Sequence, residues 1–64
     1  MYFRRIGDLR IDHDVKQTEI ASYLNVSQTT YSRYETGKLD IPTSALILLA
    51  KFYHVSIDYL LGVE

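Results

Sequence analysis

The sequence predicts an all-α fold, a single compact domain of five short helices. The chain has 64 residues, which is enough for one hydrophobic core and no second lobe. Apolar residues recur at spacings of three and four, as they do on the buried face of a helix. Three glycines and one proline punctuate the sequence lightly, with no linker, low-complexity tract or internal repeat. We therefore expect residues 1–64 to form one domain.

The first two predicted helices cover residues 3 to about 12 and about 17–24. In the first, a single apolar stripe faces the core, formed by Phe3, Ile6 and Leu9. The polar residues Asp12-His13-Asp14 end this helix. In the second, one helix face carries Ile20, Ala21 and Leu24. The small side chain in the middle of that face lets another helix approach closely.

A three-residue turn separates the second helix from a third, predicted over residues 28–35. Asn25 tolerates the left-handed conformation that ends helices, and Ser27 can cap the next N-terminus. The third helix carries Tyr31 and Tyr34 on its inner side. Its outer side consists of hydrogen-bonding groups: Gln28, Thr29, Ser32 and Arg33.

Two further helices complete the prediction. Gly37 closes the third helix, and Pro42 with Thr43 sets up the fourth. The fourth helix buries Leu46, Leu49, Ala50 and Tyr53. Ser56 caps the fifth helix, which Gly62 stops. The remaining apolar residues near the C-terminus either join the core or form an apolar dimer patch: Ile47, Leu48, Phe52, Ile57, Leu61 and Val63.

The second and third predicted helices form a supersecondary unit that suits the DNA major groove. The groove presents donors and acceptors on base edges. Gln and Arg side chains can bind adenine or guanine through two hydrogen bonds, and a Thr methyl can contact the thymine methyl. The outer side of the third helix supplies this set of groups. Without the flanking motif, the same residues would be read as an ordinary solvated helix face.

Several fragments together carry a resemblance to a known family. They are Gln17-Thr-Glu-Ile-Ala21, Leu24-Asn-Val-Ser27, Tyr31-Ser-Arg-Tyr-Glu35, Gly37, Pro42, Leu49-Ala50-Lys51 and Tyr59-Leu60-Leu61-Gly62. In this combination and spacing the chain resembles the Cro/CI-type, or XRE, helix-turn-helix regulators from Arg5 to Gly62. The resemblance implies a lambda-repressor-like domain whose motif, at about residues 17–36, belongs to the second and third helices. Most members of the family act as dimers on palindromic operators.

The resemblance also implies roles for individual residues. The expected base readers are Gln28, Thr29 and Arg33, with Ser32 as a fourth. The expected phosphate contacts are Gln17, Ser27, Lys38 and Thr43, to which the Tyr34 hydroxyl adds another candidate. Arg10 and Glu35 are expected to pair beneath the motif as a structural ion pair. Gln17 has a plainer interpretation, as a polar residue in the first turn of a helix.

Charge argues mildly against nucleic acid, because the formal net charge is −1. The distribution of charge matters more, since only charges near a face shape its screened field. If Glu19 and Glu35 face inward or sideways, the exposed face of the motif is positive. Two residues depart from the family pattern. Asn25 stands where many such motifs have glycine, and Asp40 lies in a loop that approaches phosphate in relatives.

Other classes of function find little support in the sequence. There is no cysteine, and His13 and His54 lack the spacing of a metal site or a catalytic base. Asp8, Asp12 and Asp14 lack the glycine turn and distal glutamate of a calcium loop. No apolar run is long enough to cross a bilayer, and the N-terminus does not resemble a signal peptide. We expect no enzymatic activity, no cofactor or metal, no membrane contact and a cytoplasmic location.

The leading hypothesis is therefore a sequence-specific regulator of transcription that binds double-stranded DNA. It would act as a repressor and a homodimer on a palindromic operator, with RNA polymerase as a further candidate partner. The alternative is a helical protein-interaction module, such as an antitoxin or anti-repressor, that has kept the bundle with weak or no DNA binding. The negative net charge and Asp40 motivate this alternative.

Overall fold

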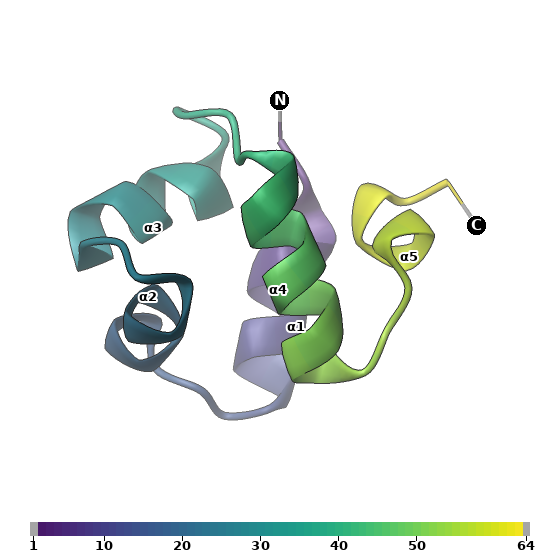
Figure 1. The fold of residues 1–64 in the computed structure, drawn as a ribbon, viewed down its shortest axis with the longest axis horizontal. Coiled ribbons are helices and arrows are strands. Elements are labelled where there is room, and N and C mark those ends of the chain that lie inside the picture. The colour runs from purple at the N-terminus through teal and green to yellow at the C-terminus, as the bar shows by residue number, and fades with distance from the viewer. Residues whose placement is uncertain (1, 64) are drawn as a thin grey trace.

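The computed structural model describes residues 2–63 and contains five helices within them. In chain order these are α1 (Arg4–Asp12), α2 (Gln17–Leu24), α3 (Gln28–Thr36), α4 (Thr43–Tyr53) and α5 (Ile57–Leu61). Helices α1 and α4 form the middle of the molecule, with α2 and α3 at one end and α5 at the other (Figure 1). The all-α prediction is confirmed, and the predicted bounds of the first three helices agree to within one residue.

Side-chain caps and left-handed residues set the ends of the helices around the motif. Asn25 ends α2 in the left-handed conformation, with φ 61° and ψ 41°. The Ser27 hydroxyl then accepts a hydrogen bond from the Thr30 backbone N–H at 3.1 Å and so caps α3. Gly37, with φ 78°, ends α3. The turn between α2 and α3 is thus fixed at both ends by local chemistry.

The core is built from one fully buried residue of every helix. These five side chains are less than 2% exposed: Ile6, Ile20, Tyr31, Leu49 and Leu60. Ala21, 2% exposed, is the small residue of α2 that allows α3 to pack closely against it. Phe3 is only partly buried and lies at the N-cap of α1, so the predicted stripe is fully buried only at Ile6 and Leu9.

Arg5 holds the short α5 against α1. Its Nη1 donates a hydrogen bond to the Tyr59 carbonyl oxygen at 2.9 Å, and its guanidinium lies 4.3 Å from the centre of the Tyr59 ring. A helix of five residues has little stability of its own. The contacts of Arg5 and the burial of Leu60 therefore fix α5 in place. Among the C-terminal apolar residues, Leu48, Phe52, Ile57 and Leu61 pack partly against the core, whereas Ile47 and Val63 are exposed.

A cavity at the centre of this core should lower the stability of so small a domain strongly. We expect Leu49→Ala to lower the free energy of unfolding by about 2–5 kcal/mol, because Leu49 is 0% exposed. Urea unfolding followed by circular dichroism measures the change. Ile11→Ala is the matched control, since Ile11 is 66% exposed on α1 and should change stability by no more than about 0.5 kcal/mol. Equal effects of the two substitutions would show that the core is misplaced.

Candidate nucleic-acid interface

A shallow hollow lies over the outer face of α3. We call it the α3 hollow, and its lining residues are Gln17, Gln28, Thr29, Ser32, Arg33, Thr36 and Lys38. It contains all four expected base readers and two of the expected phosphate contacts. Helical geometry explains the grouping, because residues three and four apart on α3 share one side. The same spacing places Thr36 there, a residue that the sequence analysis overlooked although it follows Ser32 by four positions.

The side chains that could read bases are exposed and unengaged. Gln28, Thr29 and Arg33 are exposed and Ser32 is half-buried. Within residues 2–63, no hydrogen bond or ion pair occupies the side chains of Gln28, Thr29 or Arg33. Thr36 differs, because its hydroxyl donates to the Ser32 carbonyl oxygen at 3.1 Å. The α3 hollow thus offers amide, hydroxyl and guanidinium groups on a helix that is fixed from behind by Tyr31 and Tyr34.

The expected phosphate contacts fall in different places. Lys38 and Thr43 are exposed in and after the loop that follows α3, and Gln17 is half-buried at the start of α2. The Ser27 hydroxyl is already used, since it caps α3 and donates to Thr30 Oγ1 at 2.9 Å. Tyr34 is 7% exposed and belongs to the core. Within the described residues 2–63, the buried phenol oxygens without a partner are those of Tyr31 and Tyr53, not that of Tyr34, so the phosphate contact of the Tyr34 hydroxyl stays a prediction.

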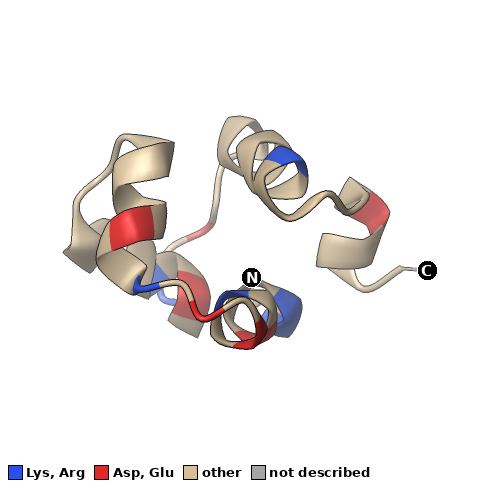
Figure 2. Cartoon of the chain, turned by 90° about the horizontal axis from the view of Figure 1, so that it is seen from below, with Lys and Arg blue, Asp and Glu red and all other residues tan. Residues whose placement is uncertain are grey.

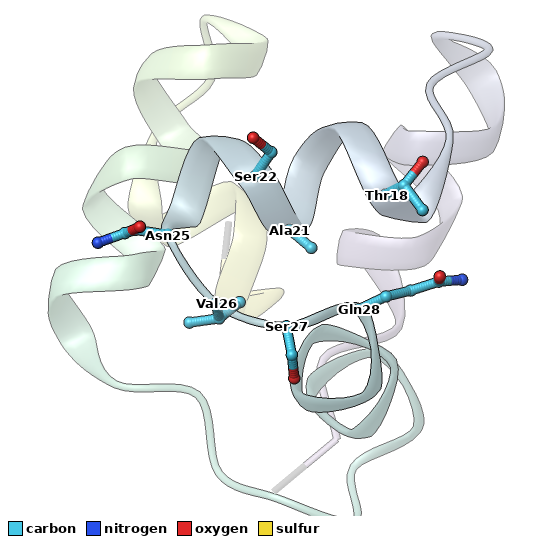
Figure 3. A pocket seen from close by; sticks show the side chains of 7 residues that line it. All are labelled: Thr18, Ala21, Ser22, Asn25, Val26, Ser27 and Gln28. Carbon is cyan, nitrogen blue, oxygen red and sulfur yellow. The ribbon is translucent and has the colours of Figure 1, made fainter.

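A second hollow lies on the other side of the turn, between α2 and the start of α3 (Figure 3). Its lining residues are Thr18, Ala21, Ser22, Asn25, Val26, Ser27 and Gln28, and we call it the turn hollow. Thr18 and Gln28 lie at one end of it and Asn25 at the other (Figure 3). The sequence analysis did not single out a polar face formed by Thr18, Ser22 and Asn25. Their spacing of four and three, along α2 and at its C-cap, indicates one.

An ion pair between Arg10 of α1 and Glu35 of α3 lies behind the α3 hollow. Two hydrogen bonds join the side chains, Nε to Oε2 at 2.7 Å and Nη2 to Oε1 at 3.0 Å. The side chains are only 17% and 12% exposed. The remaining Arg10 Nη1 donates to the Val15 carbonyl oxygen at 3.0 Å, in the loop before α2. This two-point geometry is the strong form of a charge-assisted hydrogen bond.

Burial and neighbouring charges shift the pKa values of Arg10 and Glu35 and of the nearby Tyr31 and Tyr53. Burial opposes ionisation of Glu35, but the hydrogen bonds from Arg10 and neighbouring groups outweigh it and hold the pKa of Glu35 below its usual value. The hydrogen bond with Glu35 raises the pKa of Arg10. Burial raises the pKa of Tyr53 to about 12 and also raises that of Tyr31, where the Glu35 carboxylate adds to the effect. At neutral pH the cluster therefore holds one anion, one cation and two neutral phenols.

Among residues 2–63, the Lys and Arg positions are spread over several helices and loops and alternate with Asp and Glu positions (Figure 2). Two acids fall within the motif. Glu35 is neutralised by Arg10, and the Glu19 carboxylate accepts a long 3.4 Å hydrogen bond from the Lys16 backbone N–H at the start of α2. Both acids thus face inward or toward a helix end. Arg33 and Lys38 are the cationic side chains of the α3 hollow.

The structure adds two findings on other kinds of site. Among residues 2–63, no three His, Cys, Asp or Glu side chains come together in a way that could hold a metal ion. In the same part of the chain, no helix has the length and apolar character needed to cross a membrane.

Comparisons with known proteins agree on one family. The sequence model of the family described as Helix-turn-helix matches residues 6–60. The chain is 34% identical to the uncharacterized HTH-type transcriptional regulator YobD of Bacillus subtilis, over 97% of this chain and 55% of the relative. It is 38% identical to the cryptic phage CTXphi transcriptional repressor RstR of Vibrio cholerae, over 97% of this chain and 56% of the relative. The chain thus spans little more than half the length of these relatives.

A solved structure gives the same result. The crystal structure of a transcriptional regulator from Listeria innocua superimposes with a TM-score of 0.87 at 36% sequence identity. The match covers 94% of this chain and 57% of that one.

The ion pair should make folding stability depend on pH on the acid side. Because the pKa of Glu35 is lowered by folding, its contribution is present above the unfolded-state value, near 4.5, and is lost as pH falls through the folded value. We expect Glu35→Gln to remove about 1–3 kcal/mol at pH 7 and to flatten the fall in stability below pH 5. Urea unfolding between pH 7 and pH 2.5 measures both effects.

Asp8→Asn is the matched control for this prediction. Asp8 forms an exposed ion pair with Arg4 at 3.4 Å, with the side chains 55% and 77% exposed, and such pairs contribute little. The control should therefore keep the stability and most of the acid dependence of the unchanged chain. If stability falls as steeply below pH 5 in Glu35→Gln as in the unchanged chain, the pH dependence belongs to other carboxylates.

Proposed function

The chain belongs to the XRE type of the helix-turn-helix family, and from this premise we propose that it binds double-stranded DNA in a sequence-specific manner and regulates transcription. Helix α3 would lie in the major groove with α2 across the sugar-phosphate backbone. The observation that carries the proposal is the outer face of α3, where exposed, unengaged hydrogen-bonding side chains stand on a helix anchored by the core. Such a face has donors and acceptors ready for base edges.

We assign base reading to Gln28, Thr29 and Arg33, with Ser32 as a fourth contact. Gln28 can bind the N6 and N7 edge of adenine through two hydrogen bonds, and Arg33 can bind O6 and N7 of guanine in the same way. The Thr29 methyl suits the methyl group of thymine. Each is held by the α3 backbone, so the three readers keep a fixed order along the groove.

Phosphate contacts would fix the register of α3 in the groove. We assign them to Gln17, Lys38 and Thr43, with Ser27 contributing from the turn while its hydroxyl caps α3. The Tyr34 hydroxyl is a further candidate, on a ring that the core holds in place. These residues precede and follow α3 in the chain, and Gln17 and Lys38 line the α3 hollow together with the proposed base readers.

The regulatory outcome follows from occupancy of promoter DNA. We propose repression by a homodimer on a palindromic operator, in which two copies of α3 read two half-sites about one helical turn apart. RNA polymerase is a candidate partner beside such an operator. The family consists of DNA-binding domains of transcription regulators, which is not a class of enzymes.

A second candidate function is a protein-interaction module with weak DNA affinity. The net charge of −1 and the presence of Asp40 in the loop after α3 favour it. A DNA complex and a protein complex respond differently to salt, because DNA binding releases counterions from neutralised phosphates. The salt dependence of binding therefore separates the two.

Selection from a random duplex library tests the proposed function directly. We expect an enriched palindrome, bound more weakly as salt rises. For every tenfold increase in salt, the logarithm of the affinity should fall by about 0.9 per phosphate that the protein neutralises. Lys38→Ala should reduce this slope by about one while leaving the selected sequence unchanged. No enrichment, together with no salt-sensitive binding, would favour the protein-interaction module.

Substitution of single readers tests the assignment of residues. We expect Gln28→Ala and Arg33→Ala each to relax the preference at one base position and to weaken binding by about 1–3 kcal/mol. Selections repeated with each variant reveal which position has lost its preference. Lys51→Ala on α4, outside both hollows, is the control and should keep the full site. Unchanged preferences in both reader variants would refute the assignment.

A further inference from the structure

Gln17 touches the partly buried ion pair as well as the α3 hollow. It is the first residue of α2, is half-buried, and lines the hollow beside Gln28. Its carboxamide Nε2 donates a long hydrogen bond of 3.5 Å to Glu35 Oε1. The same oxygen accepts the 3.0 Å hydrogen bond from Arg10 Nη2. The carboxylate behind the interface is thus shared between the ion pair and a residue of the interface.

We propose that Glu35 is a positioning residue for DNA binding, which acts by holding the Gln17 carboxamide in place at the edge of the α3 hollow. The inference rests on the proposed function and deepens it. A carboxamide nitrogen has two N–H donors. Glu35 takes one and so fixes the rotation of the amide group, and the second remains available for a DNA phosphate. A side chain already ordered in this way loses less entropy when it binds.

Arg10 is necessary to this arrangement because a carboxylate near a phosphate would otherwise repel it. Its two hydrogen bonds to Glu35 neutralise the carboxylate with only 12% of that side chain exposed. Its third bond, from Nη1 to the Val15 carbonyl oxygen, ties down the loop that leads into α2. One guanidinium therefore fixes both the backbone approach to Gln17 and the group that orients its side chain.

Gly7 supplies an independent observation for the same arrangement. Glycine inside a helix is unfavourable relative to alanine, yet Gly7 lies within α1. A Cβ at this position would lie 3.1 Å from Glu35 Cγ and 3.3 Å from its Cδ and Oε1. Such contacts are tighter than ordinary packing, so the Glu35 side chain would have to shift. Gly7 thus leaves the space in which the carboxylate reaches both Arg10 and Gln17.

A double-mutant cycle on DNA affinity tests the proposal with the full chain and the duplex selected for it, at one salt concentration. We expect Glu35→Gln to weaken binding roughly threefold to tenfold, the range of one hydrogen bond, and Gln17→Met to weaken it by a similar factor. In the Gln17→Met background, Glu35→Gln should have no further effect, because it acts through Gln17. A purely structural role would give the same loss in both backgrounds, and that result would overturn the proposal.

Gly7→Ala is a second variant that keeps both charges. It should weaken DNA binding only while Gln17 is present, even though alanine favours the helix. Circular dichroism at the assay temperature confirms that each variant is folded. Asp8→Asn, which alters a neighbouring residue of α1 in an exposed ion pair, is the control and should keep the affinity unchanged. Equal losses from Gly7→Ala with and without Gln17 would also count against the proposal.

The nuclear magnetic resonance spectrum of the free protein gives a readout that needs no DNA. The side-chain amide signals of Gln17 should lie away from those of the exposed Gln28 and should move toward them in Glu35→Gln. Coincident signals in the unchanged chain would overturn the proposal even if the proposed function holds. If the unchanged chain binds no selected duplex, the proposed function fails and this inference fails with it. If it binds and the cycle is additive, only this inference fails.

Discussion

The α3 hollow depends on the ion pair between Arg10 and Glu35, because that pair joins the first helix to the third behind it. Its side chains are 17% and 12% exposed, so each charge has lost much of its hydration. The two hydrogen bonds between them and the third bond to Val15 offset that loss. A hydrophobic pair of similar size could give equal stability. The ion pair differs from apolar side chains in what it orients. Arg10 holds the Val15 carbonyl oxygen and Glu35 holds the Gln17 carboxamide, and an apolar pair could hold neither.

The second requirement is an outer face of α3 whose side chains are not needed to fold the rest of the protein. This requirement is met because the core packs against the inner side of the helix, through Tyr31 and Tyr34. The ends of the helix are satisfied locally, by the Ser27 hydroxyl at the start and by left-handed Gly37 at the end. The outer side chains are therefore not needed for folding. The outer side chains of α3 can therefore be substituted without removing a residue of the core.

The sequence predicted what depends on neighbours along the chain, and the family resemblance correctly supplied the long-range Arg10–Glu35 ion pair. Other contacts across the chain were missed. Helical spacing placed α2 and the polar face of α3, and Asn25 and Ser27 marked the turn correctly. A tyrosine such as Tyr34 suits either a core or an interface, and only the tertiary packing shows that its ring joins the core. The end of α4 at left-handed His54 carried no glycine signal. The contact between Gly7 and Glu35 joins residues 28 positions apart, and no local pattern indicates it.

For DNA binding, the places of the charges matter more than the net charge of −1. Arg10 and Glu35 cancel in the interior, so neither contributes to the field that DNA would meet. Glu19 lies at the N-terminal end of α2, where a negative charge is favourable for the helix itself. The α3 hollow, which we propose faces the groove, is lined by Arg33 and Lys38 with a set of neutral hydrogen-bonding groups. Phosphate attraction that is independent of sequence should thus be weak. The difference in affinity between the correct site and other DNA must then come mainly from base contacts, and for a regulator that difference matters more than the affinity alone.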